Sequence, residues 1–360
     1  MGHTGEGELL EQAVTEPSAE AQLQFLTKLQ RLFNEGDFVA TYKYATLMAL
    51  AELAVELGQD DENALDLTHG QIAQKLIELY WQQAAPYSSG RSGSTSEVLI
   101  QNAGVQAAVV AAIEQFRLQH SGITLQTARS LPSYKELLNT VSTTASAQPL
   151  KYLQNMGGHT DTFLYERQRG SIRLLPGVMY CLRRFQPLVN QLSRQHWVAH
   201  IKRNRRNHTV LGEADDLESF LFETSRQSLG VVSRGLRKLV NGRCFYCRNV
   251  LQEADVDHFV PFALYPRDLM QNFVLAHPSC NRSKSNTLAA KEHLDRWMGY
   301  AYDHKDHLLE IGREAGVASD PEASRAVVHW SYTCAAQQGA QAWRRPGQYE
   351  TVTMDYLGAL

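Results

Sequence analysis

The feature that most constrains the fold is two short pairs of metal-ligand residues in the last third of the chain. Cys244 and Cys247 are separated by two residues, and His277 and Cys280 have the same spacing. Four such side chains in two pairs are a typical ligand set for tetrahedral zinc. The spacing therefore predicts a structural Zn²⁺ that holds residues 244–280 in one compact unit. The alternative interpretation is two buried apolar cysteines and a hydrogen-bonded core histidine.

Between and after these pairs the pattern changes from strand to helix. Residues 256–261 alternate like a short strand, which places Asp257 and His258 on opposite faces. Residues 272–277 are predicted to form a second strand. A helix is predicted from Asn281 onward through residue 297. Strand, strand and helix make a ββα unit.

This run resembles the HNH endonucleases, the ββα-metal nuclease family, over about residues 240–297. The resemblance implies that His258 is the general base and that Asp257 and Asn281 hold one catalytic Mg²⁺ or Mn²⁺. It also implies that Asn272 orients the His258 ring through a hydrogen bond to nearby backbone. The family usually has cysteine where this chain has His277, and imidazole is also a zinc ligand.

Basic side chains near and before the motif are candidates for phosphate contacts. Arg282 and Lys284 lie at the expected helix start, where positive charge and free backbone N–H groups bind phosphate. Residues 165–206 contain ten Lys and Arg against one acidic residue, and Arg203 and Arg206 are among them. This balance favours contact with a nucleic-acid backbone. The alternative for each cation is a solvated surface charge.

Helical periodicity dominates the rest of the chain. The expected fold is mainly α, a helical N-terminal domain followed by a ββα-metal (HNH) nuclease module with a structural zinc. We divide the chain into a helical regulatory or partner domain (1–160), a basic hairpin-helix nucleic-acid-binding connector (161–240), the nuclease module (241–300) and a helical C-terminal extension (301–360). Within the connector, residues 162–165 and 171–175 are predicted to form a hairpin, and residues 179–206 one long helix.

Charge and cysteine content limit which partners and which cellular compartment are expected for this chain. Residues 1–66 carry 13 Asp and Glu against 3 Lys and Arg, which argues against DNA contact there. By elimination, this domain is expected to bind a regulatory protein or a second copy of the chain. Five cysteines, three of them in the motif, do not form a disulfide framework. No apolar run approaches the ~20 residues of a membrane span, and the start lacks signal-peptide features, so we expect a cytoplasmic protein.

The sequence favours a metal-dependent DNA endonuclease that hydrolyses phosphodiester bonds. By analogy with similar arrangements of domains, its role would be in restriction or anti-phage defence. One alternative is a zinc-stabilised nucleic-acid-binding module without catalysis, and another is a nuclease that acts on RNA. The joint presence of Asp257, His258 and Asn281 favours catalysis, because a nuclease domain that has lost its activity tends to lose its general base or a metal ligand.

Overall fold

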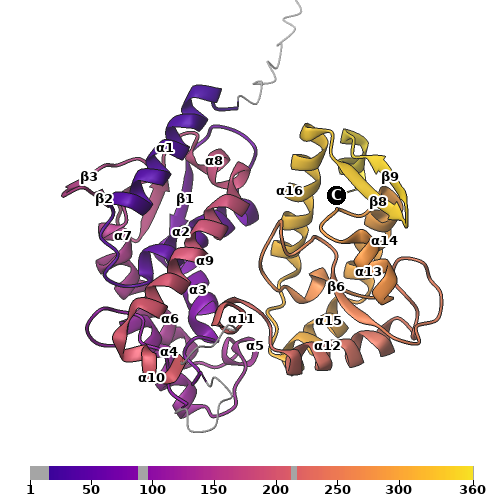
Figure 1. The fold of residues 1–360 in the computed structure, drawn as a ribbon, viewed down its shortest axis with the longest axis horizontal. Coiled ribbons are helices and arrows are strands. Elements are labelled where there is room, and N and C mark those ends of the chain that lie inside the picture. Colours follow the sequence, from indigo (N-terminus) through magenta and orange to yellow (C-terminus); the bar gives the residue numbers. More distant parts are fainter. Residues whose placement is uncertain (1–15, 88–95, 212–216, 360) are drawn as a thin grey trace, which may run out of the picture.

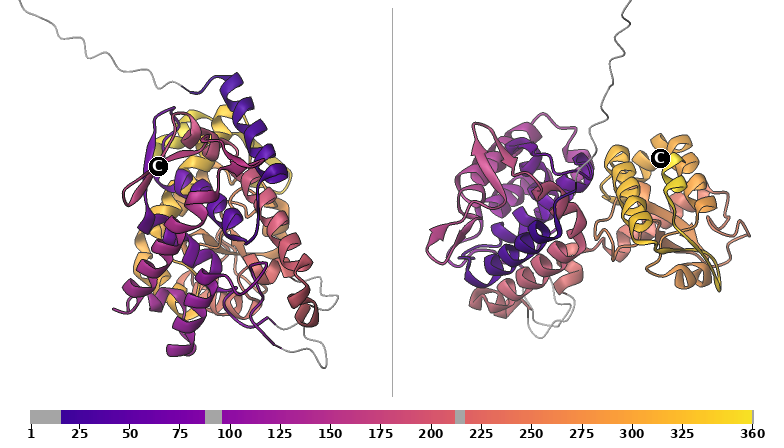
Figure 2. Two further views of the ribbon diagram at one scale, coloured as in Figure 1. Left: turned by 90° about the vertical axis from the view of Figure 1, so that its left-hand side faces the viewer. Right: turned by 90° about the horizontal axis from the view of Figure 1, so that it is seen from above.

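The buried apolar side chains of the molecule gather in two clusters. A computed structural model describes residues 16–87, 96–211 and 217–359. One cluster extends from Phe25 to Leu221, and the other joins Val55 to side chains between Val232 and Tyr356. Figures 1 and 2 show two corresponding halves side by side. We call residues 16–222 the N-terminal lobe and residues 226–359 the C-terminal lobe.

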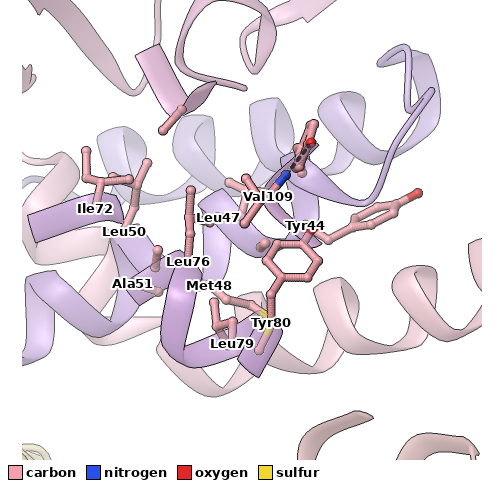
Figure 3. Packing of buried hydrophobic residues seen from close by; sticks show 14 of the residues in the cluster. Tyr44, Leu47, Met48, Leu50, Ala51, Ile72, Leu76, Leu79, Tyr80 and Val109 are labelled. Carbon is pink, nitrogen blue, oxygen red and sulfur yellow. Dashed lines mark hydrogen bonds between the residues drawn. The ribbon is translucent and has the colours of Figure 1, made fainter. Parts of the chain in front are cut away.

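Helices make up most of the N-terminal lobe. They are α1 (Ala19–Glu35), α2 (Tyr42–Leu57), α3 (His69–Trp81), α4 (Ala108–Gln119), α5 (Leu125–Ala128), α6 (Tyr134–Ala147), α7 (Pro149–Tyr152), α8 (Val178–Arg184), α9 (Gln186–Arg203), η1 (Arg205–Asn207), α10 (His208–Leu211) and α11 (Leu217–Phe222). Every residue of α2 from Tyr42 to Val55 is buried. A largely apolar helix that is buried on every side belongs inside a fold, and α3, α8 and α9 pack around α2. Figure 3 shows this core.

A small antiparallel sheet completes the lobe. Its order is β1 (Leu65–Thr68), β5 (Ser171–Leu174) and β4 (Tyr165–Gln168). The predicted hairpin is present, but its first strand covers 165–168 and the turn is at Gly170, which has a φ of +79°. β2 (Asn155–Met156) and β3 (His159–Thr160) form a separate two-stranded pair.

The prediction of one helix over residues 179–206 is wrong. The chain forms α8 and α9 instead, and between them Phe185 leaves the helical conformation with φ −107° and ψ 18°. Pro187 explains the break. A proline inside a helix lacks an N–H and clashes with the preceding turn, but it fits the first turn of a new helix.

The C-terminal lobe contains the predicted ββα unit. Its elements are α12 (Arg226–Leu239), β6 (Asp255–His258), η2 (Met270–Asn272), β7 (Phe273–Ala276), α13 (Pro278–Lys284), α14 (Lys291–Asp303), α15 (Lys305–Ala315), α16 (Pro321–Gln338), β8 (Gln341–Arg345), β9 (Gln348–Thr351) and η3 (Met354–Ala359). β6 and β7 pair antiparallel and α13 follows directly.

The helix predicted from Asn281 through residue 297 is interrupted. α13 ends at Lys284, and Ser285 has a φ of +51°, outside the helical region. Residues 288–290 pair with β8 instead: the Trp343 N–H donates to Leu288 O (2.7 Å), and the Ala290 N–H donates to Trp343 O (2.8 Å). The hairpin β8–β9 therefore becomes part of the nuclease half.

The last sixty residues contain α15, α16, the hairpin β8–β9 and η3. Their buried side chains belong to the same cluster as those of β6 and β7. The stretch is helical only in part, and the division into four stretches stays a prediction. In the described ranges, no helix has the length and hydropathy that crossing a bilayer requires.

Candidate functional site

Two turns bring the four predicted zinc ligands together. Cys244 and Cys247 precede β6, His277 is the residue immediately before α13, and Cys280 lies in the first turn of that helix. Their ligand atoms all lie within 4.8 Å of one another. A tetrahedron with metal–sulfur bonds of about 2.3 Å has edges of about 3.8 Å, so the arrangement fits a structural zinc.

Backbone groups orient these ligands. His277 Nε2 lies 3.1 Å from the carbonyl oxygen of Val250 and donates to it, while Nδ1 faces Cys247 Sγ at 3.3 Å. This contact fixes the ring and leaves Nδ1 free to bind metal. The His277 N–H also points at Cys244 Sγ, at 3.5 Å. Arg248, with a φ of +65°, turns the chain so that its N–H donates to Cys244 O.

The strand β6 sends its side chains to two sides of the hairpin. Asp257 pairs with Val274 and His258 with Phe273 in the register of β6 and β7. Alternation along a strand puts Asp255 and Asp257 on one face and His258 on the other. The expected opposition of Asp257 and His258 is present.

The face with the two carboxylates lies against α13. The Asn281 amide donates to Asp255 Oδ2 at 3.2 Å. Asp257 is 6% exposed and accepts from the Tyr246 hydroxyl at 2.5 Å, and Lys284 Nζ lies 3.3 Å from its carboxylate. The structure thus places Asp257 on β6 and Asn281 on the adjacent α13. The two side chains have different hydrogen-bond partners.

His258 meets an aspartate that sequence reasoning did not identify. Its Nε2 lies 2.6 Å from Asp268 Oδ1, and its ring contacts Phe262 and Phe273 at centroid distances of 5.3 and 4.9 Å. Burial alone raises the pKa of Asp268, but the hydrogen bond and charge of His258 and bonds from Thr224 bring it below its ordinary value. The carboxylate is therefore ionised and accepts the Nε2 proton.

Asn272 clamps the backbone just beyond His258. Its Oδ1 accepts from the Val260 N–H at 2.8 Å, and its Nδ2 donates to Val260 O at 2.9 Å. Its own carbonyl accepts from the Phe259 N–H at 2.7 Å. A buried asparagine that satisfies both backbone groups of one residue fixes the path of the chain there. The predicted role of Asn272 in orienting the His258 ring stays a prediction, since these bonds go to Val260.

The predicted phosphate contacts lie in different environments. Arg282 is exposed on α13. Lys284 is fully buried; it donates to the carbonyl of His258 at 2.9 Å, and burial lowers its pKa, partly offset by Asp257. Lys284 therefore links α13 to β6 from inside the fold. Arg203 and Arg206 are exposed at the end of α9, in the other lobe.

Comparison with known proteins finds a family match in each lobe. Residues 22–221, more than half of the chain, match the model of a domain of unknown function, DUF8808. The chain belongs to the DUF8808 family. Residues 246–290 match the HNH endonuclease family and include β6, β7 and α13. A comparison with curated proteins finds no match.

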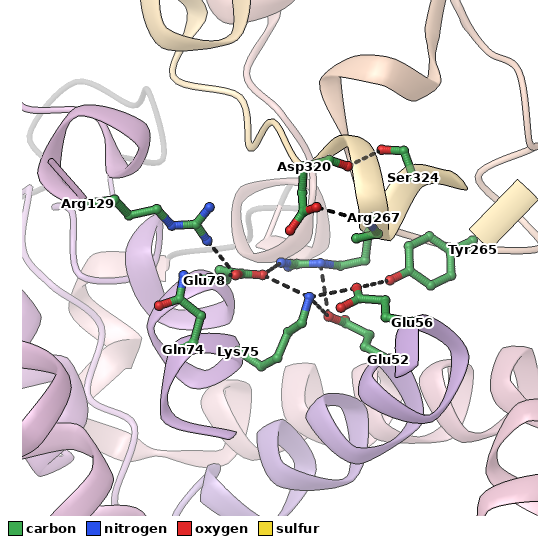
Figure 4. Close-up of polar contacts among 11 residues, drawn as sticks. Glu52, Glu56, Gln74, Lys75, Glu78, Arg129, Tyr265, Arg267, Asp320 and Ser324 are labelled. Carbon is green, nitrogen blue, oxygen red and sulfur yellow. Dashed lines mark hydrogen bonds and ion pairs between the residues drawn. The ribbon is translucent and has the colours of Figure 1, made fainter. Parts of the chain in front are cut away.

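The HNH module is connected to the DUF8808 domain by a network of buried and partly buried charged groups and one tyrosine. The groups are Glu52, Glu56, Glu78, Lys75, Arg129, Arg267 and Tyr265 (Figure 4). Arg267 comes from the HNH module; its Nε lies 3.4 Å from Glu52 and its Nη2 lies 3.0 Å from Glu78. Asp268, the partner of His258, is the next residue. The DUF8808 domain therefore holds the segment that orients the HNH histidine.

Burial and neighbouring charges act differently on the glutamates of this network. Burial raises the pKa of Glu52 to about 7, against the opposing effects of Arg267 and Lys75. Burial also acts to raise the pKa of Glu78, but Lys75, Arg129 and Arg267 together lower it to about 2. Glu78 is therefore the firmly ionised centre of the contact.

Sequence reasoning missed Asp255, Tyr246 and Asp268. Asp255 had a signal, because it lies two positions before Asp257 and so on the same strand face. Tyr246 lies between the first two zinc ligands and resembles a simple core residue. Asp268 had no signal, since it is ten residues from His258 in a loop without a fixed spacing.

Proposed function

We propose that the HNH module is a metal-dependent DNA endonuclease with His258 as the general base. The observation that carries this proposal is the Asp268–His258 pair. Because Asp268 accepts from Nε2, the form of the imidazole that can act as a base has its lone pair on Nδ1. That nitrogen takes a proton from a water molecule that attacks the phosphate. His258 is partly exposed, with 24% of its side chain accessible.

The residues present fit a hard divalent cation. Asp257 and Asn281 would hold Mg²⁺ or Mn²⁺, with Asp255 as a further oxygen donor, because carboxylate and amide oxygens suit these ions. When bound, the ion would neutralise charge on the phosphate and the leaving oxygen. Lys284 positions Asp257 by pairing with its carboxylate and with the backbone of His258.

We propose that basic side chains contact phosphate where they are exposed or line a hollow near His258. Arg282 lies one residue after Asn281 and fits this role. Arg194, on α9, is a second candidate: it lines a hollow of about 550 Å³ with Phe262, and its guanidinium lies 5.3 Å from that ring. Phe262 in turn contacts the His258 ring. Arg203 and Arg206 would contact nucleic acid only away from this hollow.

The wider roles remain proposals of the same kind. We propose duplex DNA as the substrate, a cytoplasmic setting, and a part in restriction or anti-phage defence by analogy with nucleases joined to a control domain. The DUF8808 domain would act as that control domain, through a regulatory protein or a second copy of the chain.

A binding module without catalysis is the second candidate. It is favoured by the contacts of Asp257 with Tyr246 and Lys284 and of Asn281 with Asp255, which already satisfy these groups. The affinity of such a module for nucleic acid would fall steeply as the salt concentration rises, and the module would cleave no strand.

The test offers duplex DNA, single-stranded DNA and RNA to the full chain with Mg²⁺, with Mn²⁺ and with excess EDTA. The proposal predicts scission of DNA with either ion and none in EDTA. Scission that persists in EDTA contradicts metal dependence. Salt-sensitive binding without scission under either ion supports the second candidate, and preferential cutting of RNA changes the substrate.

A further inference from the structure

A hollow in the DUF8808 domain combines aromatic and basic side chains. It has a volume of about 610 Å³ and lies where α1, α2 and the end of α9 meet. That volume is within the range of about 300–1,000 Å³ typical of small-molecule sites. Its lining lies entirely within the part of the chain that matches DUF8808.

The hollow is separate from the nuclease site. Arg194 and Val198 of α9 line the hollow beside the HNH loop, whereas His196, His200 and Arg203 line this one. Each residue of a helix turns by about 100°, so a shift of two residues leads to the opposite face. A phosphate beside the HNH histidine and a ligand in this hollow therefore lie on opposite sides of α9.

Aromatic rings form one wall of the hollow. Phe38 stacks on Tyr44 with a centroid distance of 4.4 Å and an interplanar angle of 9°, and Phe33 lies 4.8 Å from the His196 ring. Phe33 and Phe38 are only half-buried, although both are large and apolar. In Figure 3 the Tyr44 hydroxyl points away from the packed core side chains. Aromatic faces of this kind stack nucleobases.

Two imidazoles add hydrogen-bonding groups. Burial, followed by the charge of Arg203, lowers the pKa of His196 and of His200, so both are neutral near pH 7. A neutral imidazole offers one donor and one acceptor. Within the part of the chain that the structure describes, neither ring has a hydrogen-bond partner.

Three arginines follow the imidazoles at the edge. Arg203, Arg205 and Arg206 line the hollow and are exposed. No side-chain ion pair involves them among the described residues. Guanidinium groups bind phosphate through two parallel hydrogen bonds, and three of them beside an aromatic wall match a ligand with a flat ring and an anionic end.

We propose that this hollow binds a nucleoside phosphate, with the base against Phe33 and Phe38 and the phosphate at Arg203 and Arg206. The same chemistry has two sources: a free nucleotide, or the 5′-phosphorylated terminal unit of a strand. Because α9 also lines the hollow beside the HNH loop, an occupant here touches the helix that faces the nuclease. The proposal does not depend on whether the module cuts DNA.

The test is calorimetric titration of the full chain with adenosine 5′-monophosphate, adenosine, ribose 5-phosphate and a 5′-phosphorylated oligonucleotide. The proposal predicts that adenosine 5′-monophosphate or the oligonucleotide binds at least about tenfold more tightly than either fragment. Binding of the mononucleotide indicates a free nucleotide, and binding of the oligonucleotide alone indicates a strand end. Equal binding of ribose 5-phosphate, or no binding of any probe, overturns the proposal.

Variants locate the binding site. Arg203→Ala with Arg206→Ala is expected to weaken the tight interaction at least about tenfold, since two charged hydrogen-bond donors are lost. Lys202→Ala is the matched control, because Lys202 is an exposed cation of the same helix that does not line the hollow. His258→Ala is expected to bind as wild type does, which separates this result from any failure of the nuclease assay. Equal affinities of the double variant and Lys202→Ala overturn the proposal.

Discussion

Asp257 and His258 are neighbours in the chain, but each meets a different set of partners. Asp257 faces α13 and is held by Tyr246 and Lys284, whereas His258 faces Asp268. A strand separates adjacent side chains in this way. One face carries carboxylates and the other carries an imidazole held by Asp268.

Replacing Asp268 tests the orientation of the histidine. Asp268→Asn keeps the shape of the side chain but removes the charge that accepts from Nε2, so the ring loses its preferred tautomer. We expect the cleavage rate to fall by at least about tenfold, with DNA binding unchanged. The measurement is single-turnover cleavage together with a binding titration. Asp303→Asn, an exposed aspartate of α14, is the control; equal rates for the two variants would contradict the role.

At this scale the sequence predicted that Cys244, Cys247, His277 and Cys280 come together and that Asp257 and His258 lie on opposite faces. These depend on spacing within a short segment. It did not predict that Asn281 donates to Asp255 or that Lys284 is buried. Those outcomes depend on how α13 packs against β6, which no spacing rule contains.

At the scale of elements, the ββα unit is held on three sides. The zinc-ligand cluster joins the loop before β6 to α13, the pairing of β6 with β7 joins the strands, and β8 pairs with residues 288–290. Trp343 of β8 also donates from its indole to Ser283 of α13 at 3.0 Å. A short hairpin and a seven-residue helix bury little surface by themselves, so these contacts supply the stability.

Zinc removal should therefore unfold this unit. We expect about one zinc per chain in wild type, and loss of the metal with a lower unfolding temperature in Cys247→Ser, because a structural zinc site contributes directly to folding. Metal analysis by mass spectrometry and thermal unfolding measure the two effects. Cys334→Ser changes a half-buried thiol of α16 outside the cluster and is expected to retain the zinc. Full zinc content in Cys247→Ser would contradict the assignment.

The elements also show where pattern reading fails. Helical periodicity continues across residues 184–187 and 284–291, so one helix was predicted in each place. A proline divides the first, and pairing with β8, more than fifty residues later in the chain, divides the second. Proline is visible in a sequence, but a distant strand partner is not.

At the scale of the whole molecule, the two lobes meet through buried charge. Arg267 of the HNH module reaches Glu52 and Glu78 of the DUF8808 domain, and Tyr265 donates to Glu56. A second contact is the donation from the Trp330 indole of α16 to Arg183 O of α8. Charges buried this way are costly unless paired, so the contact favours one relative placement of the lobes.

The pKa of Glu52 predicts how stability changes with pH. Because its pKa is raised to about 7 from 4.5, the folded chain holds this proton more tightly than the unfolded chain. The contribution of this proton to the free energy of unfolding is complete below the pKa of Glu52 in the unfolded chain. It is lost as pH rises through about 7, the pKa in the folded chain. Glu52→Gln mimics the protonated form, so the stability advantage of the variant over wild type should be smallest near pH 5 and should grow as pH rises. The variant should exceed wild-type stability near pH 8.5 by up to about 3 kcal/mol.

Thermal unfolding of both proteins across this pH range measures the difference. Glu35→Gln alters an exposed glutamate that pairs with Arg31 on α1, and its difference from wild type should not change over this range. Parallel pH profiles for wild type and Glu52→Gln would contradict the raised pKa of Glu52.

The most direct test of the central claim is cleavage of supercoiled plasmid with Mg²⁺ by wild type, His258→Ala and His307→Ala. His307 is an exposed histidine of α15 and serves as the matched control. Loss of a general base should reduce the rate by roughly 10²- to 10⁴-fold, so wild type and His307→Ala are expected to nick the plasmid while His258→Ala, still folded and zinc-loaded, does not. Nicking by His258→Ala at the wild-type rate would contradict the assignment of His258 as the base.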